Sequence, residues 1–262
     1  MRLLSDDSAL RPRLAALDRS PWCLPALVVA VGAATCLGMW LRIPWLLPAL
    51  QALAGYPFFA AACAGAAPGR AAGRVLIFAL IAGAVVTALV ANAPRDHYAS
   101  AVPFGVAYRD DMLAFIRSGG VRGEEATPAL FLPRHAVHFV GFVILSFVTA
   151  GFGALALGAW LLDYMSYYVG SLVALAAQGG DPQRTLLLSW APYALVRVLG
   201  YALAGSGLAT LALAPRSSGK RAAWLALAAG AGLAVVDVIA KAQLAPWYGR
   251  SLLDALTHPA MR

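Results

Sequence analysis

The chain has 262 residues, of which 61% are hydrophobic and 12% are charged, and its mean hydropathy is +0.73. A soluble domain carries charge on about a quarter of its residues, so this composition excludes a soluble globular protein and predicts an all-α bundle of transmembrane helices. The formal net charge of +8 comes almost wholly from arginine, which is typical of cytoplasmic loops that face anionic lipid. No basic run lies on a soluble domain, so we expect the lipid bilayer, and no nucleic acid, as a partner.

The first 21 residues contain no apolar run of the kind found in a signal peptide. We therefore expect no cleaved leader and predict that the first span is itself the insertion signal. Within this segment, SALRPRLAALDR (8–19) places Leu10, Leu14 and Leu17 on one helical face. It predicts a short basic amphipathic helix on the cytoplasmic membrane surface, with a disordered basic tail as the alternative.

Seven apolar segments approach the roughly 20 residues that a helix needs to cross a bilayer. Three lie in residues 22–92 and four in 135–245, separated by an extracytoplasmic loop (93–134) and followed by a tail (246–262). The count is six or seven, because prolines interrupt the second segment, which could be re-entrant, and because the division of residues 135–178 is ambiguous. The predicted spans are 22–40, 44–66, 75–92, 135–158, 161–178, 187–212 and 223–245.

The distribution of positive charge predicts the orientation, because arginine and lysine concentrate in short cytoplasmic loops. With a cytoplasmic amino terminus, the short outer loops hold only Arg42 and Arg184. The long outer loop opposes this bias with Arg95, Arg109, Arg117, Arg122 and Arg134. We predict a multi-pass protein of a bacterial-type inner (plasma) membrane, whose inner side holds Arg2, Arg11, Arg13, Arg19, Arg70, Arg74, Arg216, Lys220 and Arg221.

The loop 93–134 contains a short predicted helix, DDMLAFIRSGG (110–120), with an aspartate cap and a glycine stop. Its apolar residues Met112, Phe115 and Ile116 recur at helical spacing. We expect this apolar side to lie on the membrane or on the other spans, and a lid over a cavity is the more specific interpretation.

Two histidines at the start of the fourth span, His135 and His138, share one helical face. With a loop carboxylate they could hold a divalent metal, but no HExxH motif or third ligand accompanies them. Interfacial histidines held by hydrogen bonds are the preferred interpretation, and we predict no metal and no cofactor. The sequence contains no nucleophile elbow, Walker or dinucleotide-binding motif, so no catalytic residue is assigned. The cysteines are interpreted as small core residues: Cys23, Cys36 and Cys63.

Three charged residues lie inside the apolar spans, where each costs about 2.5–3.5 kcal/mol to insert and therefore suggests a function. Arg197 lies about 10 Å from Trp190 along a helix, whereas Asp237 and Lys241 lie about 15 Å and 9 Å from Trp247. If the last two spans are antiparallel neighbours, Arg197 lies level with the gap between the other two. We predict an Arg197–Asp237 ion pair, with Lys241 sharing it or extending outward. Asp163 is predicted near the inner surface and is a poorer partner.

Part of the chain, VGSLVALAAQGGDPQRTLLLSWAPYAL (169–195), resembles the Yip family of small polytopic membrane proteins. In that family a helix ends at a Gly-Gly turn, here Gly179 and Gly180, and the next helix contains a proline, here Pro192. The resemblance transfers no catalytic residue; eukaryotic members are membrane-traffic factors, and bacterial members are mostly of unassigned function. Residues 191–207 and 241–246 are similar to stage II sporulation protein M, whose acidic residues are replaced here by Arg197 and Lys241.

These features predict a non-enzymatic scaffold or partner-binding subunit of a membrane complex, with other membrane protein subunits as partners. A small-solute transporter or permease subunit, using the Arg197, Asp237 and Lys241 cluster in a polar cavity, is the alternative. A metal-dependent membrane enzyme at His135 and His138 is a third. The transporter requires a water-reachable cavity that touches Asp237, whereas the scaffold requires a dry, closed ion pair.

Overall fold

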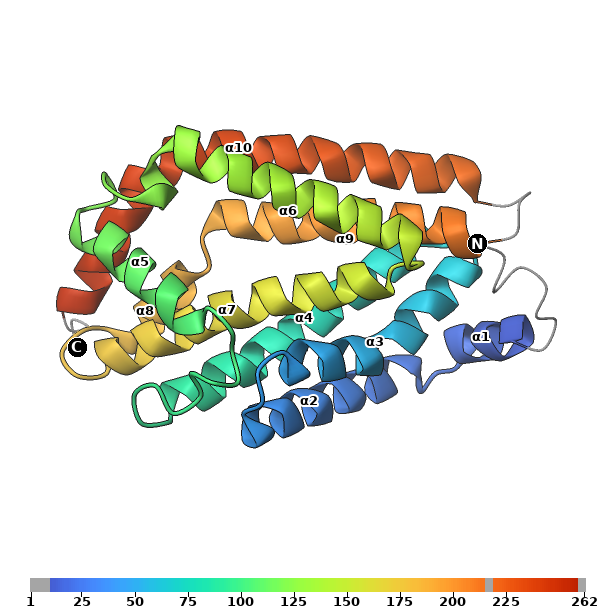
Figure 1. Cartoon of the computed structure of the whole chain (residues 1–262), viewed down its shortest axis with the longest axis horizontal. Coiled ribbons are helices and arrows are strands. Elements are labelled where there is room, and N and C mark those ends of the chain that lie inside the picture. The colour runs from blue at the N-terminus through green and yellow to red at the C-terminus, as the bar shows by residue number, and fades with distance from the viewer. Residues whose placement is uncertain (1–9, 215–218, 259–262) are drawn as a thin grey trace.

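The computed structural model describes residues 10–214 and 219–258, and these residues form ten α-helices and one short 3-10 helix, with no strand (Figure 1). An all-helical architecture is what lipid demands, because a helix satisfies its own backbone hydrogen bonds. Six helices are long and apolar enough to cross a membrane: α2 (Cys23–Leu41), α3 (Leu46–Ala64), α4 (Pro68–Ala91), α6 (Pro128–Val148), α9 (Pro192–Leu213) and α10 (Lys220–Thr257). The chain is a multi-pass helical membrane protein.

A seventh long helix, α7 (Phe152–Ala176), runs alongside these six. It packs against α3, α4, α5, α6 and α8, so it is the most central element of the bundle. Its buried face includes Asp163 and Ser166, and these polar residues reduce its mean hydropathy. Central burial replaces lipid with protein around these groups, which is why a helix of this composition is tolerated here.

The remaining helices mark the two ends of the bundle. The α1 end carries α1 (Leu10–Arg19) and the turns at 65–67 and 149–151, while Gly219 packs against Ala66 there. The α5 end carries α5 (Gly105–Arg117), the 3-10 helix η1 (Glu124–Ala126), α8 (Pro182–Ser189) and the last turns of α10. Helix α1 is tied to α4, because Asp18 accepts from Arg74 at 2.6 Å and pairs with Arg70 at 3.1 Å.

The predicted division of residues 135–178 was wrong in position. The chain turns at 149–151, where Ala150 and Gly151 have positive φ values of 52° and 94°. The predicted break at 158–161 is absent, because Gly158 lies inside the continuous helix α7. A left-handed glycine ends a helix at little cost, so Gly151 is the effective breakpoint. Asp163 therefore lies in the middle of a 25-residue helix and not near a membrane surface.

Other predicted boundaries also moved. The segment 44–66 is one continuous helix, α3, with Pro57 inside it. The segment 187–212 is broken before Pro192, which begins α9 and, having no N–H to donate, is favoured in a first helical turn. The predicted tail from 246 is helical. It belongs to α10, which bends near Pro246 and continues to Thr257 (Figure 1).

The predicted loop helix exists as α5, but it begins at Gly105 and not at an aspartate cap. Its apolar side lies on the other spans, because Met112, Phe115 and Ile116 pack in one cluster with Tyr168 and Tyr248. Cys23 and Cys63 are buried as expected, whereas Cys36 is exposed on the outside of α2. Arg2 and Arg216, which entered the orientation argument, lie outside the described residues.

Candidate functional site

Helices α9 and α10 approach so closely that only glycine fits at their contact. A Cβ atom on Gly230 would lie 2.5 Å from the backbone nitrogen of Ala204 and from the carbonyl oxygen of Gly200. Such small-residue faces allow two membrane helices to pack backbone against backbone. The contact fixes the register of the two helices and holds Arg197 of α9 opposite Asp237 of α10.

Arg197 and Asp237 form a bidentate ion pair. The guanidinium Nε donates to Asp237 Oδ2 at 2.8 Å, and Nη2 donates to Oδ1 at 3.1 Å. Asp237 is only 2% exposed, whereas the Arg197 side chain is 20% exposed. The planar fork of arginine matches a carboxylate in this geometry, so the pair is strong and closely defined.

Lys241 does not share this pair and does not extend outward. Its Nζ lies 2.9 Å from Glu125 Oε1 in η1, and the lysine side chain is 1% exposed. The same nitrogen lies 4.4 Å from the centre of the Phe131 ring at the start of α6, within the range of a cation–π interaction. Lys241 therefore ties the long loop to α10.

The two histidines do not converge on a metal site. His135 Nδ1 lies 2.8 Å from the Phe131 carbonyl oxygen, its Nε2 lies 4.0 Å from Asp237 Oδ2, and that nitrogen is buried without a hydrogen-bond partner. The His138 ring packs edge-on against Trp160. Across residues 10–214 and 219–258, no three His, Cys, Asp or Glu side chains are grouped as a metal would require.

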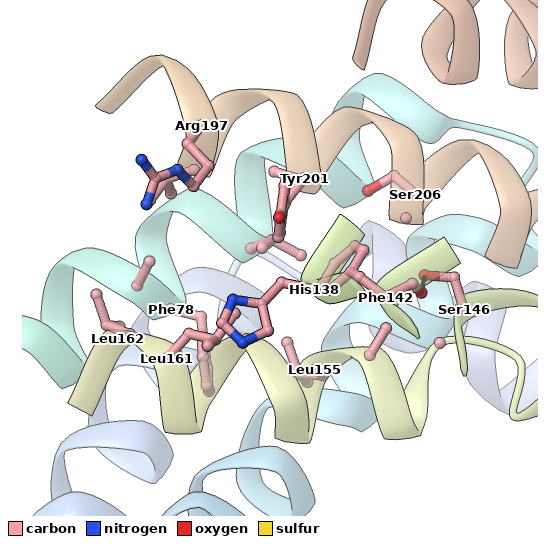
Figure 2. Close-up of a pocket in the computed structure, with 18 of the residues that line it drawn as sticks. Phe78, His138, Phe142, Ser146, Leu155, Leu161, Leu162, Arg197, Tyr201 and Ser206 are labelled. Carbon is pink, nitrogen blue, oxygen red and sulfur yellow. Dashed lines mark hydrogen bonds between the residues drawn. The ribbon is translucent and has the colours of Figure 1, made fainter. Parts of the chain in front are cut away.

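A narrow cavity of about 90 Å³ adjoins the ion pair, between α4, α6, α7 and α9. Figure 2 shows Arg197 and His138 toward one part of it and Ser146 and Ser206 toward another, with Tyr201, Phe142 and Leu155 between them. Asp237 does not line this cavity. The walls are therefore mostly apolar, and the ion pair contributes only its arginine.

A second hollow, of about 380 Å³, opens at the α5 end beside α5 and the end of α7. Three arginines line it, Arg95, Arg109 and Arg117, with Asp96 as the one carboxylate among its lining residues. Asp96 accepts hydrogen bonds from Arg109 and, at 3.0 Å, from Tyr167.

The ionisation of this arginine network follows from its contacts. Burial by itself would raise the pKa of Asp96, but the hydrogen bonds from Arg109 and Tyr167 outweigh it, and the pKa lies below its usual value. Burial by itself would lower the pKa of Arg109, but the hydrogen bonds to Asp110 and Asp96 outweigh it, and the pKa lies above its usual value. Asp96 and Arg109 are therefore both charged near neutral pH.

One polar cluster was missed by sequence reasoning. Asp163 is fully buried and accepts a hydrogen bond from Gln51 Nε2 at 2.9 Å, and Gln51 also contacts Thr35 at 3.3 Å. The signal was present, since Gln51 and Asp163 are both polar residues within apolar runs. It was not used because the wrong breakpoint placed Asp163 at a surface.

Ion pairs hold the long loop at the α5 end to the bundle, and others order the loop internally. Lys241 binds Glu125 from α10, and Arg134 of α6 binds Glu124 at 2.8 Å. Arg109 pairs with Asp96 and Asp110 within the loop itself.

Comparison with protein-family models, curated proteins and solved structures finds no match to this chain.

Proposed function

We propose that the protein is a non-enzymatic, partner-binding subunit of a membrane complex, and that its α5 end binds an acidic segment of another protein. The arginine-lined hollow is the observation that carries this proposal. Its lining residues include Arg95, Arg109 and Arg117 against one carboxylate, Asp96, and with Asp110, which pairs with Arg109, three arginines against two aspartates leave a formal charge of +1. Arginine is enriched in binding interfaces, and a positive hollow favours an acidic partner.

The proposed surface has a buried, fixed arginine, Arg109, and two exposed arginines above it, of which Arg95 lies 3.7 Å from Asp96 Oδ2. Arg109 is buried and held by two aspartates, whereas the Arg95 side chain is 81% exposed and Arg117 is also exposed. Helix α5 is anchored through its apolar face to α7 and α10. A binding surface that is already ordered loses little conformational entropy when a partner docks.

The orientation belongs to the same proposal. At the α1 end, Arg13, Arg19, Arg70 and Arg221 lie in or beside short connections, which favours a cytoplasmic α1 end. The hollow would then face the outer side of a bacterial-type inner membrane. The resemblance of residues 169–195 to the Yip family agrees with a membrane role that requires no catalytic residue.

A site-specific photocrosslinker tests the partner. We place it at Leu175, an exposed leucine that lines the hollow, and use Leu225, an exposed leucine on α10, as the matched control. We expect Leu175 to crosslink in cells to a protein of defined mass through an acidic peptide, and the double variant Arg95→Glu, Arg117→Glu to lose this product. Lipid adducts alone at Leu175, or a protein adduct that survives the charge reversal, would contradict the proposal.

Transport is the second candidate, favoured by the cavity that reaches Arg197. Against it, Asp237 is buried, and both of its carboxylate oxygens accept hydrogen bonds from Arg197. The carboxylate is therefore not available to a solute. Ala202 lines the cavity and provides a test in a background without Cys23, Cys36 and Cys63. Transport requires that Ala202→Cys react with a membrane-impermeant thiol reagent, whereas a closed bundle leaves the thiol unlabelled.

A further inference from the structure

The residues that line the cavity between α4, α6, α7 and α9 extend along much of the length of α6 and α9. Its lining residues on α9 run from Ala194 to Ser206, which is about 18 Å at the helical rise. On α6 they run from His135 to Ser146, about 17 Å. Because the hydrocarbon core of a bilayer is about 30 Å thick, the cavity follows the direction of lipid chains for more than half of that depth.

We propose that this cavity binds a single-chain amphiphile, with its polar head at Arg197 and His138 and its hydrocarbon chain along α7 and α9. The inference is independent of the partner-binding role proposed above. Phe78, Leu155 and Leu162 supply apolar wall along the chain (Figure 2). Apolar pockets with a few polar groups that orient the ligand are typical of small-molecule sites.

The polar groups define the head. Arg197 uses Nε and Nη2 for Asp237, and its Nη1 makes no hydrogen bond to any residue that the structure describes. His138 makes no hydrogen bond within the same set of residues and is only partly buried. Both side chains can donate, so the head must carry hydrogen-bond acceptors, as a carboxyl or an ester does.

The surrounding charges select among such heads. Asp237 already neutralises Arg197, and Glu125 neutralises Lys241, so this cluster contributes no net positive charge. A phosphate monoester with two negative charges would remain uncompensated in an apolar site, which is costly. The expected ligand is therefore a fatty acid bound with its carboxyl group protonated and neutral, or a comparable ester-bearing chain.

The packing of α6 provides a route from the bilayer. This helix forms one wall of the cavity, yet its only buried residues are Phe131, Phe142 and Ser146. It packs against α7 and α9, and most of its remaining residues are exposed or partly exposed. A hydrocarbon chain that enters beside α6 would pass from lipid to cavity without crossing a polar region.

A photoreactive fatty acid with a mid-chain diazirine tests the site on the purified protein in nanodiscs. We expect saturable labelling of peptides from α6, α7 or α9 at the cavity, and competition by unlabelled palmitic acid but not by a lysophosphatidic acid of the same chain length. A Cβ on Gly158 has room, with Phe142 nearest at 3.6 Å, so Gly158→Leu should fill the cavity and reduce this labelling about tenfold or more.

The control variant is Gly232→Leu, because nothing lies within 4 Å of a Cβ at that position on α10. Its labelling should match that of the wild type, and both variants must keep the wild-type melting temperature for the comparison to count. If Gly158→Leu does not fold, Ala202→Leu fills the same cavity from α9. Labelling that does not saturate, that maps to exposed positions outside the cavity, or that persists in the folded filled variant would overturn the proposal.

Discussion

Removal of either partner of the Arg197–Asp237 pair should destabilise the protein far more than removal of both. Asp237→Leu leaves a guanidinium that loses its two hydrogen bonds at 2.8 Å and 3.1 Å. Arg197→Leu leaves a carboxylate, 2% exposed, whose nearest remaining basic group among the described residues is the imidazole Nε2 of His135 at 4.0 Å. An uncompensated buried charge of this kind costs about 3–5 kcal/mol. The double variant leaves no charge behind and replaces the pair with apolar side chains, which is often nearly neutral.

The measurement is the free energy of unfolding of the four proteins in lipid bicelles, completed as a double-mutant cycle. We expect each single variant to lose about 3–5 kcal/mol and the double variant to lose less than either single variant, well below the sum of the two single losses. Insertion and expression of each variant serve as the control for a defect in assembly. Single variants that unfold like the wild type, or a double variant whose loss equals the sum, would refute the reasoning that the pair is a closed clamp.

Lys241→Met should preserve α10 but release Glu125, so hydrogen exchange in η1 should rise while exchange in the centre of α10 stays unchanged; equal exchange in both proteins would contradict the tether. The pKa of Asp96 is lower in the folded protein than its usual value. The ionised Asp96 therefore stabilises the folded loop fully above the unfolded pKa of about 3.9, and this stabilisation is lost as the pH falls through the folded pKa. Pepsin should therefore cleave the loop at 92–127 more readily as the pH drops below about 4, and Asp96→Asn should remove this dependence. Gly230→Leu should separate α9 from α10, since its Cβ would meet backbone at 2.5 Å, whereas Gly232→Leu should be tolerated; equal melting temperatures for the two variants would show that the close approach is not required.

Much of the ion pair could be predicted because it depends on a short-range hairpin. Arg197 lies 17 residues before Ala214, and Asp237 lies 18 residues after Gly219. Two antiparallel helices joined by a short connection bring such positions level, whatever the rest of the bundle does. The depths of Asp237 and Lys241 were measured from Trp247 as the end of the span, and this reference point was wrong, because α10 continues past Trp247.

The amphiphile cavity and the arginine hollow had no comparable signal. The cavity depends on four helices that leave a gap at one place, and no local pattern specifies how side chains from separate helices fill the space between them. The hollow depends on how α5 folds back onto α7, with Asp96 in a left-handed conformation at φ 61°. Both are properties of packing between distant segments.

Composition and periodicity by themselves determined that this is a multi-pass all-helical membrane protein, because apolar runs of span length have few other stable forms in lipid. They also placed Arg197, Asp237 and Lys241 inside apolar spans, although they missed Asp163. Only the tertiary structure decided where those charges are satisfied: Lys241 with Glu125, across 116 residues of chain, and Asp163 with Gln51. Burial of an ionised or polar group requires a partner but does not specify it. The partner is determined by which helices become neighbours.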